Sequence, residues 1–238
     1  MKRFITLLCV VSTAFLSASD TLVVGTNAEF PPYTTIENGQ IVGFDIDIAK
    51  EVATRLGKKI EFKDMPFEAL IPDVVFGYVD FVAAGMSYTA ERAQRVLFTK
   101  PYLAGDPLVI LTAEKTSEPL TLDDLIGKTV AVNEGFTADT LVSAKEGITV
   151  VRLATISDGF LALKSKRVFA FVTARSTYET FLQIQPNQFF SHELLGTSET
   201  CALVVPKSNL ELLVQIQTAL DAMQQDGTIA KLKSKWGL

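Results

Sequence analysis

Along the first half of the chain, short strand-like runs alternate with segments whose apolar residues recur at helical spacing. An order of strand, helix, strand, helix, strand predicts a parallel sheet with helices packed on it. Ligands of such sheets gather beyond the carboxyl ends of the strands. The predicted strands are 22–26, 59–62 and 79–84, and the helical segments are 44–56, with Asp45 expected to cap its start, and 67–71.

The second half repeats this alternation, so we expect a second lobe of the same general architecture. No low-complexity linker separates the halves, which favours short connecting strands over a flexible tether. A long amphipathic helix, 210–225, and a final helix ending at Trp236 are expected to close the chain. The other predicted strands are 96–98, 108–112, 128–132, 149–153, 168–173 and 201–205, and the other helices are 138–145, 157–164, with Ser157 as its cap, and 176–182.

Two loops follow predicted strands of the first half and are expected to meet at one edge of the sheet. One holds two prolines between Phe30 and Tyr33, which break the strand. The other runs from Gly85 to Arg92, with Ser87 and Thr89 as candidate helix caps. A cation such as Arg92 in the first turn of a helix opposes the helix dipole. A carboxylate bound by the planar guanidinium would offset this unfavourable interaction with the dipole. The alternative interpretation is that Arg92 is an ordinary surface arginine.

The first residues have the pattern of a cleavable signal peptide. A basic start is followed by an apolar run, residues 4–16, and by the small residues 17–19. Cleavage before Asp20 removes two basic residues, so the formal net charge changes from −5 to −7. We therefore expect an exported chain, and its acidic balance argues against a nucleic-acid partner. The remaining thiol, Cys201, and the lone His192 form neither an internal disulfide nor a set of zinc ligands.

Several motifs occur together in a specific order: VVGTNAEFPPY, GFDIDIAKEVA, VDFVAAGMSYTAER, FTKPY, GKTVAVNEGFT and DGTIAKLKSKW. Over the whole mature chain they resemble the polar amino-acid solute-binding proteins of bacterial ABC importers, family 3. The resemblance implies the two-lobed α/β fold of type II periplasmic binding proteins, joined by two crossover strands. The implied division is 1–19 signal peptide, 20–104 with 203–238 as lobe 1, and 105–202 as lobe 2. Ligand would bind in the cleft and be buried by hinge closure.

The resemblance also implies a ligand site. Arg92 would clamp the α-carboxylate of the ligand, helped by the Ser87 hydroxyl and the Thr137 N–H, and the Gly85 carbonyl would accept from its ammonium. Phe30, Phe67 and Tyr33 would wall the side-chain pocket, and Asn27 would contact the far end of the side chain. The expected ligand-binding set is Asn27, Glu29, Phe30, Tyr33, Phe67, Gly85, Met86, Ser87, Arg92, Phe136, Thr137 and Ala174.

Two departures from the family pattern bear on the ligand. Ala174 stands where an acidic residue usually neutralises the ligand ammonium, with Phe169 in place of the usual strand aspartate, and Phe136 stands where a small hydroxyl residue is common. An ammonium buried without an anion costs several kcal/mol, in order of magnitude. Either another acid takes over or the ligand is not an ordinary α-amino acid. The acids considered are Glu29, Glu134, Glu179 and Glu199.

We therefore expect a periplasmic, monomeric binding protein, without cofactor or metal, that delivers a polar amino acid to an inner-membrane ABC permease. Arginine is the first guess, since Glu29 and Glu134 near the cleft could accept a basic side chain. The alternatives are a protein for a non-amino carboxylate, a sensory binding protein, and an enzyme similar to cyclohexadienyl dehydratases. The enzyme would need a general acid, and the expected position is Ala174.

Overall fold

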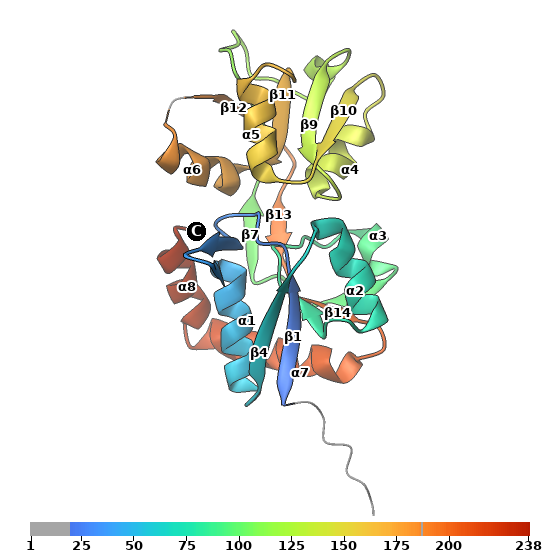
Figure 1. Cartoon of the computed structure of the whole chain (residues 1–238), viewed down its shortest axis with the longest axis vertical. Coiled ribbons are helices and arrows are strands. Elements are labelled where there is room, and N and C mark those ends of the chain that lie inside the picture. Colours follow the sequence, from blue (N-terminus) through green and yellow to red (C-terminus); the bar gives the residue numbers. More distant parts are fainter. Residues whose placement is uncertain (1–19, 187) are drawn as a thin grey trace, which may run out of the picture.

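The computed structural model describes residues 20–186 and 188–238, which form two α/β lobes, one above the other in Figure 1. The predicted signal peptide, residues 1–19, lies outside the described residues. Each lobe is built on a five-stranded sheet. Among the helices of the described part, none is long and apolar enough to cross a membrane.

Lobe 1 has the sheet order β4-β1-β5-β14-β6, in which β1 is parallel to β4 and β5, and β14 is antiparallel to β5 and β6. Phe81 and Val82, neighbours in β5, are fully buried in different hydrophobic clusters, so both faces of the sheet are covered. The elements are β1 Thr21–Thr26, β2 Thr35–Glu37, β3 Gln40–Val42, α1 Phe44–Arg55, β4 Lys59–Asp64, η1 Phe67–Ala69, α2 Leu70–Phe76, β5 Phe81–Val82, α3 Ala90–Ala93, β6 Val96–Phe98 and β14 Val204–Pro206.

Lobe 2 has the sheet order β10-β9-β11-β8-β12, with β10, β9 and β11 parallel and β8 antiparallel to both of its neighbours. Phe171 packs with α5 on one face of this sheet, and Val172 packs with α4 on the other. The elements are β8 Leu108–Thr112, η2 Asp123–Leu125, β9 Thr129–Asn133, α4 Thr137–Ser143, β10 Thr149–Leu153, α5 Ile156–Lys164, β11 Ala170–Ala174, α6 Arg175–Ile184 and β12 Phe190–Glu193.

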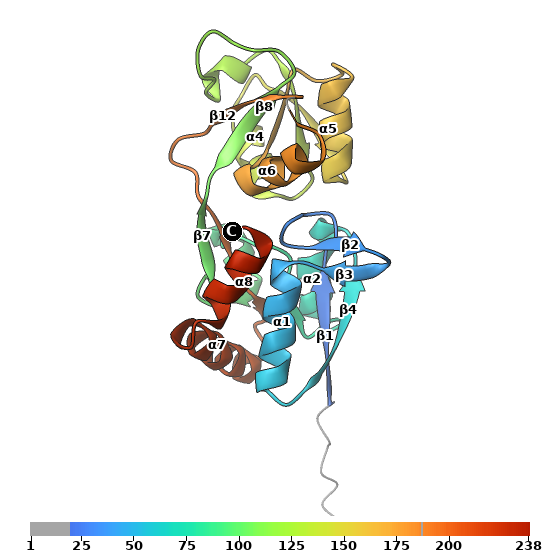
Figure 2. The ribbon, with the colours of Figure 1, turned by 90° about the vertical axis from the view of Figure 1, so that its left-hand side faces the viewer.

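Two crossover strands, β7 (Leu103–Asp106) and β13 (Glu199–Cys201), pair antiparallel between the lobes. Figure 2 shows β7 passing from one lobe to the other along one side of the molecule. The family resemblance implied two crossover strands, but the strand predicted at 201–205 is not one strand. The region is divided into two strands: β13 ends at Cys201 and pairs with β7, whereas β14 pairs with β5 and β6 in the lobe 1 sheet.

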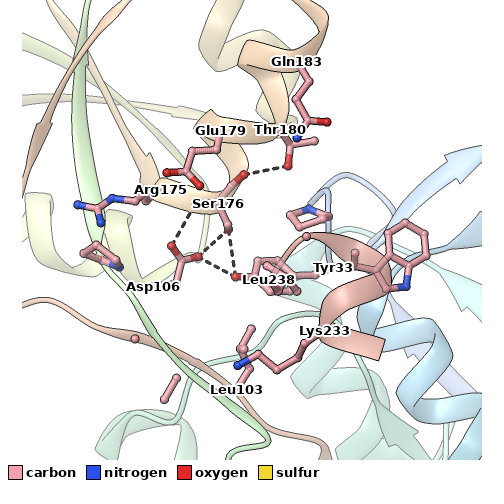
Figure 3. A pocket seen from close by; sticks show the side chains of 16 residues that line it. Tyr33, Leu103, Asp106, Arg175, Ser176, Glu179, Thr180, Gln183, Lys233 and Leu238 are labelled. Atoms are coloured by element: carbon pink, nitrogen blue, oxygen red, sulfur yellow. Dashed lines mark hydrogen bonds between the residues drawn. The ribbon is translucent and has the colours of Figure 1, made fainter. Parts of the chain in front are cut away.

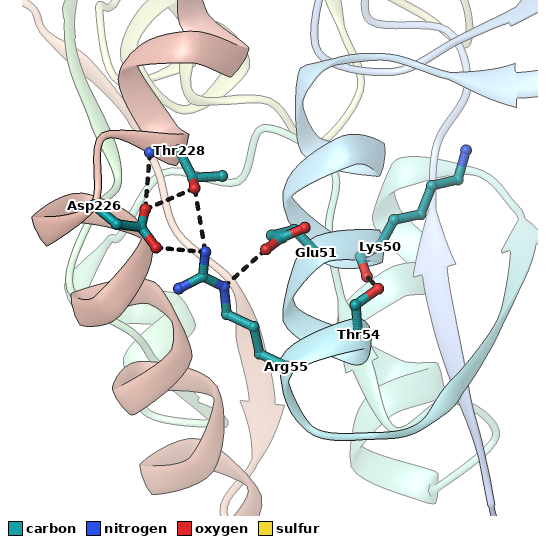
Figure 4. A network of polar contacts seen from close by, with 6 residues as sticks. All are labelled: Lys50, Glu51, Thr54, Arg55, Asp226 and Thr228. Carbon is teal, nitrogen blue, oxygen red and sulfur yellow. Dashed lines mark hydrogen bonds and ion pairs between the residues drawn. The ribbon is translucent and has the colours of Figure 1, made fainter.

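The C-terminal helices α7 (Leu210–Gln225) and α8 (Thr228–Trp236) return to lobe 1 and pack against α1. Figure 4 shows how the junction of α7 and α8 is tied to α1. Arg55 Nη2 lies 2.8 Å from Asp226 Oδ2, and Arg55 Nε lies 2.8 Å from Glu51 Oε1. Thr228 donates to the same aspartate, so one arginine near the end of α1 holds the start of α8.

The helix caps expected at Asp45 and Ser157 proved wrong. Helix α1 is preceded by Gly43, and the Asp45 side chain accepts from Gly85 instead of capping the helix. Thr155, not Ser157, caps α5 and accepts from the backbone N–H of Asp158. Strand β12 was not predicted, because its side chains are mostly exposed and show no apolar alternation.

Candidate functional site

The Gly85 turn at the carboxyl end of the lobe 1 sheet needs glycine for two reasons. Gly85 has φ of 60°, and a Cβ there would lie 2.7 Å from Phe30 Cε1. Its N–H donates to Asp45 Oδ2 at 2.5 Å. Burial raises the pKa of the Asp45 carboxyl to about 6, against the opposing effect of this hydrogen bond. The start of α1 therefore fixes the turn that leads to Ser87 and Arg92.

Arg92 is held at the cleft by carbonyls of both lobes. Of the two candidate caps, Ser87 and Thr89, the structure shows Thr89 as the cap of the short helix α3. Its side chain accepts from the Arg92 N–H at 3.1 Å. The Arg92 guanidinium donates to Ser87 O at 2.7 Å and across the cleft to Gly135 O at 2.9 Å. It also lies over the Phe67 ring, 5.3 Å from the centroid. Burial lowers its pKa, partly offset by the attraction of Glu199.

Lobe 2 brings the loop at Gly135 to this arginine. Gly135 has φ of 76°, and its N–H donates to Asp139 Oδ2 at 3.2 Å. Asp139 lies in the first turn of α4, where its charge suits the helix dipole, and it also accepts from Arg152 Nε at 3.0 Å. This arrangement orients the Gly135 carbonyl and places Thr137 at the start of α4 beside the cleft.

One carboxylate oxygen joins hydroxyls of both lobes. Glu199 Oε2 accepts from Ser87 Oγ at 2.9 Å and from Thr137 Oγ1. Ser87 Oγ also lies 2.8 Å from Thr200 O and accepts from Thr200 N at 3.0 Å. Burial raises the pKa of Glu199, while the two hydroxyls and the charge of Arg92 oppose the increase. Glu199 comes from β13, so a crossover strand contributes to the site.

Aromatic side chains close the space between the lobes. The Phe136 ring lies 4.4 Å from the Phe67 ring and 5.2 Å from the Phe30 ring, between centroids. Behind Phe136 is a cavity of about 10 Å³, smaller than any amino acid. The space behind Phe136 is therefore filled by the side chains of the protein itself, while a separate cavity of about 260 Å³ lies on the side of Arg92, Phe67 and Gly135. The cavity behind Phe136 is lined by Phe30, Leu108, Asn133, Phe136, Thr137, Ala138, Val172, Thr173, Ala174 and Glu199.

The predicted site residues fall into two groups. Gly85, Ser87, Arg92, Phe30, Phe67, Phe136, Thr137 and Ala174 meet around the cleft. Asn27 is engaged elsewhere, because its Nδ2 donates to Met65 O at 3.1 Å. Met86 packs in the core of lobe 1 and also borders the cavity beside Arg92. Glu29 lies near acids of both lobes. Burial is the largest cause of its raised pKa, followed by the charges of Asp64 and Asp158.

Tyr33 contributes its ring to the core beside Phe30, but its hydroxyl points to the hinge. It donates to Asp106 Oδ2 at 2.7 Å. Ser176 Oγ donates its one proton to Asp106 Oδ2 at 2.6 Å and lies 3.0 Å from the Tyr33 hydroxyl, and the Ser176 N–H donates to Asp106 Oδ1 at 3.1 Å. Figure 3 shows this contact, which links lobe 1, a crossover strand and lobe 2 beside a cavity of about 260 Å³.

Asp106 and Ser176 were not singled out in the sequence. Asp106 follows an ordinary Ala-Gly step, and Ser176 was assigned only to a helix, so no local signal marks either residue. Their role depends on where the crossover strand passes. Among the four acids considered for the ligand ammonium, Glu134 and Glu179 are exposed and Glu29 lies outside the small cavity. Glu199 lines that cavity together with Ala174.

Comparison with known proteins gives consistent matches over nearly the whole chain. The family model for bacterial extracellular solute-binding proteins, family 3, matches residues 22–238. The "ABC transporter arginine-binding protein 1" of Escherichia coli (strain K12) is 29% identical, covering 99% of both chains. The "Arginine-binding extracellular protein ArtP" of Bacillus subtilis (strain 168) is 31% identical, covering 92% of this chain and 87% of the relative.

Solved structures agree with the fold. An ancestral arginine-binding protein bound to arginine superposes with a TM-score of 0.85 at 39% identity, covering 91% of this chain and 98% of the other. A mutant of ArgBP from T. maritima gives a TM-score of 0.86 at 38% identity, covering 91% and 95%. The two-lobed fold expected of a type II binding protein is confirmed.

Proposed function

The chain belongs to the bacterial extracellular solute-binding proteins of family 3, and from this premise we propose that it captures a polar α-amino acid, arginine first, for an ABC importer. The observation that carries the proposal is the Arg92 guanidinium, held in the cleft by the carbonyls of Ser87 and Gly135 beside two hydroxyls. A guanidinium has five N–H donors, and these carbonyls use two. A cation and hydroxyl donors at one point suit a carboxylate.

In this proposal the ligand carboxylate binds Arg92, Ser87 and Thr137, and the Gly85 carbonyl accepts from the ligand ammonium. Phe30, Phe67 and Phe136 would pack against the ligand side chain. Since the donors come from both lobes, an open cleft would hold only part of the set, and closure would complete it. The division into 20–104 with 203–238 and 105–202 is supported by the pairing of the strands.

Two lines of support favour a cationic side chain. The relatives in E. coli and B. subtilis are named for arginine, and one similar structure contains it. In this chain burial, and then the charges of Asp64 of lobe 1 and Asp158 of lobe 2, raise the pKa of Glu29. A guanidinium or ammonium entering near these acids would relieve their repulsion.

The family is extracytoplasmic, and the binding proteins of such transporters work with a membrane permease. For this chain we propose export through the predicted signal peptide and action as a monomer in the periplasm, without cofactor. Family and relatives are solute-binding proteins, so the chain is not an enzyme. The alanine at position 174 supports one second candidate, a ligand that is a carboxylate without an amino group.

A thermal-unfolding panel tests the proposal. The mature protein is unfolded and refolded to remove bound ligand, then melted with each of the twenty amino acids, ornithine and simple carboxylates. A ligand at one hundred times its dissociation constant adds about 2.7 kcal/mol, which corresponds to a rise of several degrees. We expect a rise with arginine that disappears in Arg92→Ala and persists in Arg167→Ala, an exposed arginine far from the cleft. A rise with non-amino carboxylates alone would favour the second candidate, and no rise at all would contradict the proposal.

A further inference from the structure

The small cavity behind Phe136 contains one ionisable side chain among its described lining residues, and that side chain is Glu199. The remaining lining is apolar apart from Asn133, Thr137 and Thr173. An α-amino acid brings an ammonium as well as a carboxylate, and a buried ammonium needs an anion nearby. Among the residues that line this cavity, such an anion can come only from β13, where Glu199 lies.

Glu199 bonds the hydroxyls of Ser87 and Thr137, two residues that the proposed function assigns to the ligand carboxylate. Its Oε2 accepts from Ser87 of lobe 1 and Thr137 of lobe 2, and Arg92 attracts its charge. A glutamate carboxylate and a ligand carboxylate offer these donors the same chemistry. Each hydroxyl has one proton to donate, so it cannot serve two carboxylates at once. Glu199 thus stands in the place of a ligand carboxylate at these hydroxyls.

We propose that Glu199 is an exchangeable internal ligand: the incoming carboxylate displaces it from Ser87 and Thr137, and it then pairs with the ligand's ammonium. This rests on the proposed function. Two carboxylates at one pair of hydroxyls would repel each other, which drives the displacement. The displaced Glu199 carboxylate needs a cation in a dry cleft. The ligand's own ammonium can supply it, because it is attached to the carbon next to the ligand carboxylate.

The exchange has opposite consequences for two kinds of ligand. When the ligand is an amino acid, Glu199 competes with the ligand carboxylate for the two hydroxyls but then forms an ion pair with the ligand ammonium. For the same molecule without its amino group, Glu199 only competes, because no cation replaces the lost partners. Loss of the Glu199 charge should therefore weaken binding of the amino acid and leave the des-amino ligand unchanged or tighter. Glu199 is thereby a residue that selects for the amino group.

The test uses calorimetric titration of ligand-free protein with arginine and with 5-guanidinopentanoate, which is arginine without its amino group. Glu199→Gln removes the charge but keeps the size and an oxygen acceptor. We expect it to weaken arginine binding about ten-fold or more, the effect of losing one charge-assisted hydrogen bond. Binding of 5-guanidinopentanoate should not weaken. The matched control, Glu146→Gln, changes an exposed acid of lobe 2 and should alter neither affinity.

A second variant separates the exchange from general damage to the cleft. Adding Ala174→Asp to Glu199→Gln returns an acid to the same cavity, and arginine binding should recover at least in part. Equal weakening of both ligands in Glu199→Gln, or unchanged arginine affinity, would overturn the exchange while leaving the proposed function intact. If the unaltered protein binds neither arginine nor any other amino acid, the proposed function fails and the exchange fails with it.

Discussion

Across the cleft, lobe 1 and lobe 2 present different chemistry. Lobe 1 contributes a cation and a turn whose atoms are fixed inside that lobe, with Asp45 holding Gly85 and Thr89 capping the helix of Arg92. Lobe 2 contributes a carbonyl, a hydroxyl and the Phe136 ring, and its strand β11 ends at Ala174, without a charge. Glu199, an acid that bonds a hydroxyl of each lobe, comes from a crossover strand.

This asymmetry separates two tasks. A fixed cation on one lobe can meet a ligand while the cleft is open, whereas atoms on the other lobe are added by closure. The carboxylate of Glu199 touches both lobes, so its partners exist only when the lobes are together. If this is correct, changes within lobe 1 should affect its stability and carboxylate binding, and changes at the contacts between the lobes should affect closure.

The largest effect is expected at Arg92. Arg92→Lys keeps the positive charge but loses the planar fork that reaches the carbonyls of both lobes. By calorimetry we expect the affinity for arginine to fall by about 2 kcal/mol or more, and Arg92→Ala to lose more still. An affinity of Arg92→Lys within about three-fold of the unaltered protein would show that a point charge suffices.

The pH dependence of stability should depend on Asp45. Burial raises its folded pKa from an ordinary 3.8 to about 6, so between these values the folded protein binds a proton more tightly than the unfolded chain does. The contribution of Asp45 to the free energy of unfolding is therefore largest below pH 4 and falls as the pH rises through 6. The shift corresponds to about 3 kcal/mol, in order of magnitude.

Asp45→Asn removes this titration while an amide oxygen can still accept from Gly85. Urea unfolding at pH 4, 5, 6 and 7 should show the stability difference, unaltered protein minus variant, decreasing with pH. A difference that is constant over this range would mean that Asp45 is not buried as an acid with a raised pKa.

A methyl group at Gly85 should distort the fixed half. Gly85→Ala combines a positive φ with a Cβ placed 2.7 Å from the Phe30 ring. We expect a loss of about 2 kcal/mol in the free energy of unfolding, as the sum of backbone strain and overpacking. Gly77→Ala is the matched control, since Gly77 also has a positive φ but no atom within 4 Å of the added Cβ. Its loss should be about 1 kcal/mol, and equal losses would contradict a close contact at Phe30.

The smallest effect is expected at the hinge. Tyr33→Phe removes the hydroxyl that joins lobe 1 to Asp106 and Ser176, a loss of about 1 kcal/mol that should act on closure. Arginine affinity should fall about five-fold, and small-angle scattering should show a larger average radius without ligand. Tyr178→Phe, whose hydroxyl bonds Phe189 within lobe 2, should leave both quantities unchanged. The same effects in both variants would argue against a closure contact at Tyr33.

Much of the fold follows from local pattern. The predicted bounds of β8, β10 and α7 agree with the structure, because these segments are uniformly apolar or strongly periodic. The region 201–205 was assigned to one strand, since its sequence does not reveal that the chain changes partner from β7 to the lobe 1 sheet. Asp45 resembled a helix cap, and only the tertiary fold shows that its partner is Gly85.

The site divides in a similar way. Arg92 was found from its own sequence, because a cation in the first turn of a helix conflicts with the dipole. Glu199 was one of four acids considered, and nothing near it in the sequence distinguishes it from Glu179. Its position depends on the pairing of β13 with β7 and on contact between the lobes. Properties that arise from closure cannot be deduced from one segment at a time.

The central claim is that the cleft recognises the carboxylate of an amino acid through Arg92. Its most direct test is a calorimetric titration of ligand-free protein with arginine and with agmatine, which has the same guanidinium but no carboxylate. We expect one arginine bound per chain and agmatine bound at least a hundred-fold more weakly, a difference of about 2.7 kcal/mol. Equal binding of the two, or no binding of arginine, would contradict it.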